Sequence, residues 1–337
     1  MSSTPPSEMR GSDRSIRRSQ WIRAALKWGV FLLIVVLVTR HGMHLWDQVD
    51  RQRLVVRWGW FSVATLASVA GWLPSVWFWR KLITALVPAP PWRQVVRAYY
   101  CGHPGKYVPG KAVVIAIRGA LLRPCGVPYP VSIYTVTLET LTCMAAGVVT
   151  MVLLLPWILA ALPRMREFAE TLSHPASRLG LPLAAVVASL AGLAVLNSLS
   201  RKLGERLRGT AAGFSALERP IPVRTLALGL VLFLAGWWFQ GATLGLTLQA
   251  LSSEPVDWSH WPHWTAAATA STVGGFVALF APGGLGVREG LVMELLEGTV
   301  GPKQAVAAAL LWRATALTGE VGMAVLLYFA VRPPQES

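Results

Sequence analysis

Long apolar runs, separated by short polar segments, dominate the pattern along the chain. Six of these runs are close to the roughly 20 residues that a helix needs to cross the hydrocarbon core of a bilayer. They occupy residues 21–39, 58–78, 131–155, 179–199, 225–250 and 304–331. The pattern predicts an all-α, polytopic membrane protein with about six full transmembrane helices.

Two further apolar stretches, residues 94–123 and 264–297, are each interrupted by a Pro-Gly step. Proline cannot donate to the hydrogen-bond ladder of a helix, and glycine permits a sharp reversal of the backbone. Each stretch is therefore predicted to form a re-entrant helical hairpin, whose two arms each cross half of the membrane. The turns are predicted at Pro109, Gly110, Pro282, Gly283, Gly284 and Gly286.

The two predicted hairpins also resemble each other. Gly102 lies seven residues before Pro109, and Gly275 lies seven residues before Pro282. Broken helices that meet near the bilayer midplane from opposite sides are typical of transporters built from inverted-topology repeats. The sequence therefore suggests such a repeat, and the alternative is two unrelated Pro-Gly interruptions in a long chain.

Composition supports the same class of protein. Apolar residues make up 54% of the chain and charged residues only 14%, whereas soluble domains carry about 25% charged residues. The net charge of +15 is expected to mark cytoplasmic loops rather than a nucleic-acid site, and it places both termini in the cytoplasm. The predicted parts are a disordered basic cytoplasmic tail at 1–20, a single integral membrane domain at 21–331 with repeat halves 21–161 and 179–331, and a short cytoplasmic tail at 332–337.

Charged residues within the predicted spans and hairpins mark a candidate site. Glu139 lies in the third span, and Arg313 and Glu320 lie in the sixth. An ionisable side chain at the bilayer centre costs about 2.5–3.5 kcal/mol on insertion scales, so these groups should face protein or a polar groove. Glu139 and Arg313 are predicted to pair, either as part of a functional site or as a structural ion pair that sets helix register.

The hairpins add further charges, and the helices that follow their turns should point their N-termini inward. Helix N-termini favour anions, and arginine binds phosphate through two parallel hydrogen bonds. We therefore expect a site for an anionic headgroup, although lysine and arginine near an interface also snorkel toward water without binding a ligand. The candidate substrate-binding residues are Lys111, Arg118, Glu139, Arg288, Glu289, Arg313 and Glu320.

Motifs for other chemistry are not found in the sequence. It contains no phosphate-binding loop of the Walker type, no HExxH and no GxSxG. The pairs His41–His44 and His260–His263 each lack a third metal ligand, and Cys101, Cys125 and Cys143 are not spaced as ligands. No catalytic residue, metal or cofactor is therefore predicted.

The segment PGGLGVRE, from Pro282 to Glu289, resembles the transmembrane-region family of lysylphosphatidylglycerol synthases, a flippase-like integral membrane domain. The segment GKYVPGK, followed by Arg118, Gly126-Val127 and Glu139, is similar to the family's order of a Pro-Gly-Lys turn, an arginine, a glycine-hydrophobic step and a glutamate in the next span. Arg313 also fits, and the resemblance covers most of residues 20–331. It implies a multi-pass protein of the bacterial inner membrane that handles polar lipids, without the soluble lysyltransferase domain of longer members.

The main hypothesis is thus a flippase-like transporter rather than an enzyme. Its lipid would be a phospholipid, an aminoacyl-phospholipid, a hopanoid or a lipid-linked sugar. The alternatives are a membrane-embedded transferase with Glu139 or Glu289 as its base, and an accessory subunit for lipid-linked glycan or envelope lipid synthesis. The expected partners are membrane lipids with anionic headgroups and no nucleic acid. An envelope-biosynthesis enzyme and a second copy of the chain are further candidates.

Overall fold

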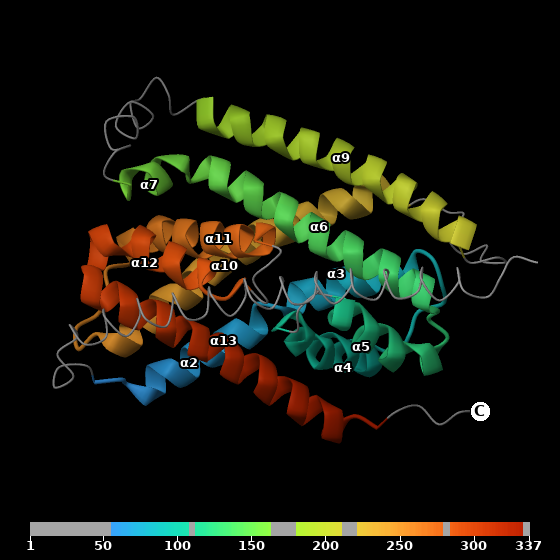
Figure 1. Cartoon of the computed structure of the whole chain (residues 1–337), viewed down its shortest axis with the longest axis horizontal. Coiled ribbons are helices and arrows are strands. Elements are labelled where there is room, and N and C mark those ends of the chain that lie inside the picture. Colours follow the sequence, from blue (N-terminus) through green and yellow to red (C-terminus); the bar gives the residue numbers. More distant parts are fainter. Residues whose placement is uncertain (1–54, 108–111, 163–179, 211–220, 279–283, 333–337) are drawn as a thin grey trace, which may run out of the picture.

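The computed structural model describes residues 55–107, 112–162, 180–210, 221–278 and 284–332. Throughout these residues the regular structure is helical, as predicted, and the helices form one elongated bundle with their axes roughly along its length (Figure 1). Short helices connect the long ones: η2 (Arg123–Cys125), α7 (Leu155–Ala160) and η5 (Trp258–His260).

Five helical stretches among the described residues are long and apolar enough to cross a membrane. They are α2 with α3 (Trp58–Ala70 and Leu73–Thr84), α6 (Tyr129–Leu153), α9 (Gly180–Thr210), α10 (Val223–Leu251) and α13 (Pro302–Ala330). These stretches confirm five of the six predicted spans. The first predicted span, residues 21–39, lies outside the described residues.

The second predicted span is not one continuous helix. It is interrupted after Ala70 and restarts at Leu73 as α3, which continues to Thr84. Pro74 lies in the first turn of α3, where its missing N–H needs no partner, and it could not continue the hydrogen-bond ladder of α2. The interruption places Trp72 at the centre of the bundle, where it lines the cavities described below.

The two Pro-Gly stretches form helical hairpins. The first consists of α4 (Trp92–Gly102), η1 (His103–Tyr107) and α5 (Ala112–Leu122), and the second of α11 (Trp261–Val277) and α12 (Val287–Val300). In each hairpin the second helix packs on the first. The hairpins lie toward opposite ends of the bundle (Figure 1).

The hairpin turns are described only in part. Pro109, Gly110, Pro282 and Gly283 lie outside the described residues. Gly284 and Gly286 have φ angles of 70° and 85°, a backbone conformation that glycine adopts readily and other residues rarely do. Both predicted turn positions therefore have a backbone conformation that favours glycine in a tight turn.

The helices of the two halves pack in a crossed arrangement. The first helix of each hairpin contacts the last long helix of the other half, so that α4 packs on α13 and α11 packs on α6. The span that precedes each hairpin follows the same rule, since α2 packs on α13 and α10 packs on α6. The interior between these helices therefore receives side chains from both hairpins.

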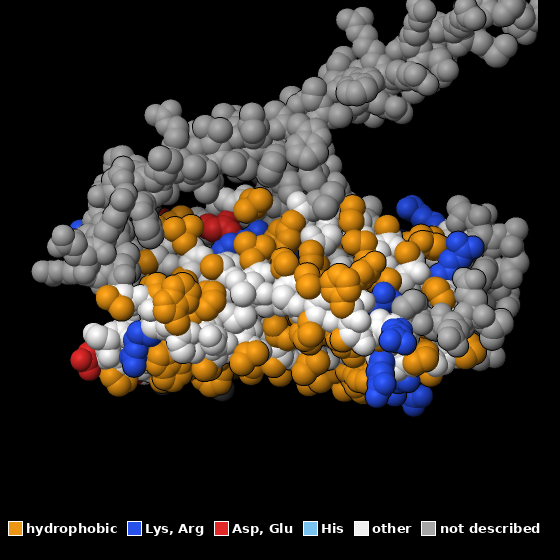
Figure 2. All heavy atoms as spheres, turned by 90° about the horizontal axis from the view of Figure 1, so that it is seen from below, with side chains coloured by type: hydrophobic (Ala, Val, Ile, Leu, Met, Phe, Trp, Pro, Cys, Tyr) orange, Lys and Arg blue, Asp and Glu red, His pale blue; other side chains and the backbone are white. Residues whose placement is uncertain are grey.

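The surface of the bundle is apolar between its two ends. Large hydrophobic side chains such as Leu183, Val277 and Phe329 are 64%, 70% and 77% exposed, as expected for helices that face lipid. Basic side chains gather at one end (Figure 2). Basic residues occur near the ends of α3, α5, α9 and α13 and near the start of α4: Arg80, Lys81, Arg93, Arg123, Arg201, Lys202 and Arg332.

Candidate functional site

Two cavities meet in the middle of the bundle. The larger, which we call the α6 cavity, has a volume of about 320 Å³ and lies between α4, α5, α6 and α11. The smaller, the α13 cavity, has a volume of about 40 Å³ and lies between α2, η1, α10, α12 and α13. Trp72, Lys106, Thr272 and Arg288 line both cavities. The larger volume falls within the range of small-molecule sites.

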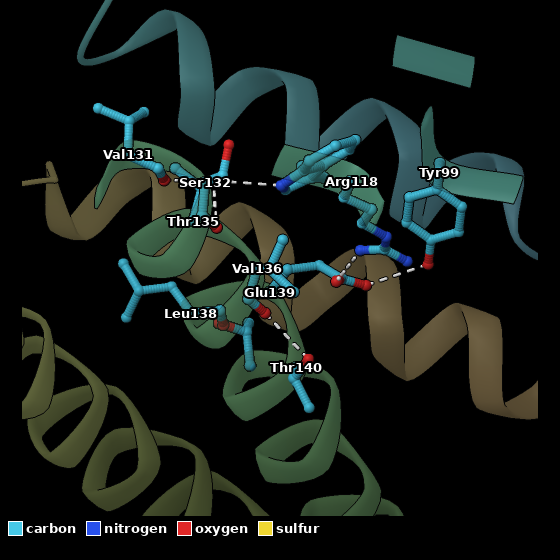
Figure 3. A network of polar contacts seen from close by, with 11 residues as sticks. Tyr99, Arg118, Val131, Ser132, Thr135, Val136, Leu138, Glu139 and Thr140 are labelled. Atoms are coloured by element: carbon cyan, nitrogen blue, oxygen red, sulfur yellow. Dashed lines mark hydrogen bonds and ion pairs between the residues drawn. The ribbon is translucent and has the colours of Figure 1, made fainter. Parts of the chain in front are cut away.

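The α6 cavity contains a buried ion pair between α5 and α6. Nη1 of Arg118 donates to Oε2 of Glu139 over 2.9 Å, and the Tyr99 hydroxyl donates to Oε1 of Glu139 over 3.1 Å (Figure 3). One turn earlier on α6, Oγ1 of Thr135 accepts from Nε1 of Trp79. The carboxylate therefore has partners on both oxygens, which offset much of the cost of burying it.

Aromatic rings also hold Arg118 in place. Its guanidinium carbon lies 3.8 Å from the centre of the Tyr99 ring and 5.0 Å from that of Trp79. Cation–π contacts of this kind are most favourable where water is excluded. Arg118 is only 3% exposed, so its guanidinium is enclosed by the protein.

A second ion pair joins the first hairpin to α13. Nζ of Lys106 lies 2.6 Å from Oε1 of Glu320, and the Tyr107 hydroxyl donates to Oε2 of Glu320 over 2.9 Å. Nε2 of His103 lies 3.6 Å from the same carboxylate. Lys106 also lies over the ring of Trp72 at 5.5 Å from its centre. Glu320 therefore faces the first hairpin from the middle of α13.

The third ion pair joins the second hairpin to α13. Nε of Arg313 lies 3.5 Å from Oε1 of Glu289. The other oxygen of Glu289 accepts a 2.7 Å hydrogen bond from the backbone N–H of Gly286, at the start of α12. A carboxylate in the first turn satisfies and stabilises a helix N-terminus. The N-terminus of α12, which we expected to face an anionic ligand, thus already holds a carboxylate of the chain itself.

Arg288 is bound differently from the other basic residues. Its Nη2 donates to the hydroxyl of Thr272 on α11 over 2.7 Å, and its side chain is only half-buried. Among the described residues no carboxylate lies within ion-pair distance of it. Arg288 lines both cavities, so it connects them.

The structure corrects one predicted contact. Glu139 pairs with Arg118 and not with Arg313, which instead pairs with Glu289. The reason is the packing: α6 contacts α5 and α11, whereas α13 contacts α4 and α12. Charges on the long spans are therefore neutralised by charges on the hairpins rather than by each other.

The other predicted site residues fall into two groups. Arg118, Glu139, Arg288, Glu289, Arg313 and Glu320 all line the two cavities, whereas Lys111 lies outside the described residues. Sequence reasoning missed Lys106, His103, Tyr99 and Trp72. The sequence could have indicated Lys106 and His103, because they flank Pro104 and Gly105, a second Pro-Gly step just before Pro109.

Chemically, the arrangement is a small basic site inside an apolar bundle. The cavity walls carry four lysine and arginine side chains and three carboxylates, counted over the described residues and leaving His103 aside. An excess positive charge away from bulk water favours an anion, because the local dielectric is low. The residues therefore suit an oxyanion better than a cation.

Comparison with known protein families gives a match over most of the chain. Residues 22–319 match the family described as the lysylphosphatidylglycerol synthase TM region, and no other domain is detected in the chain. A search of curated proteins gives no match.

Proposed function

This chain belongs to the lysylphosphatidylglycerol synthase TM region family, and we propose that it is a flippase-like transporter of a lipid with an anionic headgroup in a bacterial inner membrane. One observation carries the proposal: side chains from both hairpins converge with α6 and α13 on two adjoining cavities that carry excess positive charge. Ionisable groups at such depth in a membrane protein usually mark a substrate pathway.

The lining of the α6 cavity suits an amphiphile. Lys106 and Arg288 supply its basic groups, beside the Arg118–Glu139 ion pair. Apolar side chains on α5, α6 and α11 form much of the rest: Val114, Ile115, Val136, Leu141, Met144 and Phe276. A headgroup would lie against Arg288 and Lys106, and its hydrocarbon tails would lie along these apolar side chains toward the lipid. A soluble anion would make no use of the apolar lining.

The distribution of basic residues supports an orientation. Lys and Arg are enriched on the cytoplasmic side of membrane proteins, so the end that carries Lys81, Arg93, Lys202 and Arg332 would be cytoplasmic. The α4–α5 hairpin would then enter the membrane from the cytoplasm and the α11–α12 hairpin from outside. Rocking of the two halves around a central site is the common mechanism in inverted-repeat transporters.

Purified protein in liposomes tests the proposal. Fluorescent phosphatidylglycerol would be placed in both leaflets, and dithionite would bleach the outer leaflet. The wild-type chain is expected to expose the inner-leaflet probe, whereas Arg288→Ala with Arg313→Ala should slow this step by about tenfold or more, the effect of losing charge-assisted hydrogen bonds. Lys202→Ala, an exposed lysine on α9, is the matched control and should transport normally.

The same experiment separates the alternatives. Unchanged transport by the double variant would contradict the site. A covalently altered lipid produced by the purified chain would indicate a membrane-embedded transferase. Co-purification with an envelope enzyme, without transport by the chain alone, would indicate an accessory subunit.

A further inference from the structure

The charge inventory of the two cavities leaves one cation without a carboxylate. Lys106 pairs with Glu320, Arg118 with Glu139, and Arg313 with Glu289, at distances of 2.6 to 3.5 Å. Arg288 donates to a neutral hydroxyl instead. Within the part of the chain that the structure describes, the excess positive charge of the site therefore resides on Arg288.

Arg288 is also better placed than Arg118 to receive a ligand. Arg118 is 3% exposed, lies against two aromatic rings and is paired with Glu139, so a ligand would have to compete with Glu139 for its guanidinium. Arg288 lines both cavities and is half-buried. Its Nη2 points to Thr272, which leaves further guanidinium N–H groups for a ligand, since arginine carries five.

We infer that Arg288 is the residue that binds the anionic group, and that the site is tuned to a headgroup with one net negative charge, such as a phosphodiester. This inference rests on the proposed function. A singly charged headgroup neutralises the excess charge counted over the described residues. A zwitterion leaves the positive excess in place, and a phosphomonoester dianion introduces a negative excess. An uncompensated charge in a low-dielectric site is costly, so the charge balance sets specificity. Arg118 is a positioning residue that holds α5 against α6.

Transport selectivity in liposomes tests this charge balance. The probes are fluorescent phosphatidylglycerol, phosphatidylcholine and phosphatidic acid, compared at pH 8, where a phosphomonoester is mostly a dianion because its second pKa is about 6. The wild-type chain is expected to transport phosphatidylglycerol at least about tenfold faster than the other two, the effect of one charge-assisted hydrogen bond. Absence of this preference in a transporting wild-type chain would overturn the inference.

Three variants change the charge in defined steps. Arg288→Gln removes the excess and should abolish the preference for phosphatidylglycerol, whereas Arg288→Lys keeps the charge and should retain part of it. Glu289→Gln raises the excess to two and should shift the preference toward phosphatidic acid by about tenfold. Its amide oxygen can still accept the Gly286 N–H, so α12 keeps its cap.

The double variant Arg288→Gln with Glu289→Gln restores an excess of one and should recover the preference for phosphatidylglycerol in part. This recovery distinguishes a charge effect from loss of folding, because a misfolded Arg288→Gln protein would not regain selectivity through a second substitution. An Arg288→Gln protein that keeps the wild-type preference, or a double variant without recovery, would overturn the role of Arg288.

Failure of this inference is distinguishable from failure of the proposed function. If the wild-type chain transports none of the three lipids, the transporter proposal is wrong. Glycerophosphoglycerol, which carries the same phosphodiester without tails, is added as a soluble competitor and should compete weakly. Competition as strong as that of the lipid, lost in Arg288→Gln, would leave the anion-binding role of Arg288 intact and contradict the lipid substrate.

Discussion

In the first hairpin, Gly102 on α4 leaves room for the stem of Arg118 on α5, and in the second, Gly275 on α11 leaves room for the stem of Arg288 on α12. A Cβ atom at either glycine would collide with Cγ of the facing arginine. The two hairpins thus hold an arginine in the same manner. They differ in what the arginine meets beyond the hairpin.

The long helix that follows each hairpin makes the difference. After the first hairpin, α6 carries Glu139, which neutralises Arg118. After the second, α13 carries Arg313, and the neighbour of Arg288 in sequence, Glu289, pairs with it. The first hairpin therefore holds its arginine in a buried ion pair. The second leaves its arginine facing the cavities without a carboxylate partner. A similar local structure thus holds its arginine in an ion pair in one half and against a neutral hydroxyl in the other.

Removal of the carboxylate from the closed pair should have the largest effect. Glu139→Ala leaves Arg118 buried without a counter-charge, and loss of one partner of a buried pair lowers the free energy of unfolding by about 3–5 kcal/mol. Unfolding by SDS in mixed micelles, followed by circular dichroism, would measure the shift. A variant as stable as the wild type would contradict the structural role that we assign to Arg118.

Substitution of the glycine that faces the arginine should lower stability by a similar amount in both hairpins. The effect should be smaller than that of Glu139→Ala. Gly102→Ala and Gly275→Ala each force a methyl group against an arginine stem, and such overpacking costs about 1–3 kcal/mol. Gly298→Ala, on α12 with open space around its Cβ position, is the control and should stabilise the helix by up to about 1 kcal/mol. If only one hairpin glycine were sensitive, the proposed equivalence of the hairpins would be wrong.

Hydrogen bonds at the two arginine sites should show the same asymmetry, and the one at Arg288 should have the smallest effect of all. Thr272→Val removes the acceptor of Arg288, but water in the cavity can replace it, so the expected loss is about 1 kcal/mol or less. Tyr99→Phe removes a buried donor to Glu139 and should cost about 1.5–3 kcal/mol. The same SDS titration compares them, and an equal loss would argue against an open Arg288.

Sequence reasoning worked best for properties that depend on composition over a window. The predicted spans 225–250 and 304–331 agree closely with α10 and α13, at Val223–Leu251 and Pro302–Ala330. Hydrophobic length is sufficient for this purpose because every backbone group in a membrane helix is satisfied within the helix. The interruption at Gly71–Trp72 was missed, because the residues around it are as apolar as the helices on either side.

The candidate site was predicted in its residues but not in its contacts. Buried charges in apolar segments are visible in any hydropathy pattern, and this pattern identified Arg118, Glu139 and Arg313. The predicted pair of Glu139 with Arg313 was wrong because spacing along a helix gives the face of a residue, not the helix that this face meets. Lys106 was missed because it belongs to a short helical turn, and only the tertiary packing brings this turn next to Glu320 on α13.

Apolar run lengths and misplaced charges in the chain were thus enough to specify a helical membrane protein with polar groups in its interior, since both follow from the cost of exposing polar groups to hydrocarbon. The choice of partner for each charge depended on how the hairpins pack against α6 and α13. That packing joins residues far apart in the chain, such as Lys106 and Glu320. It is also what neutralises Arg118 and leaves Arg288 facing the cavities.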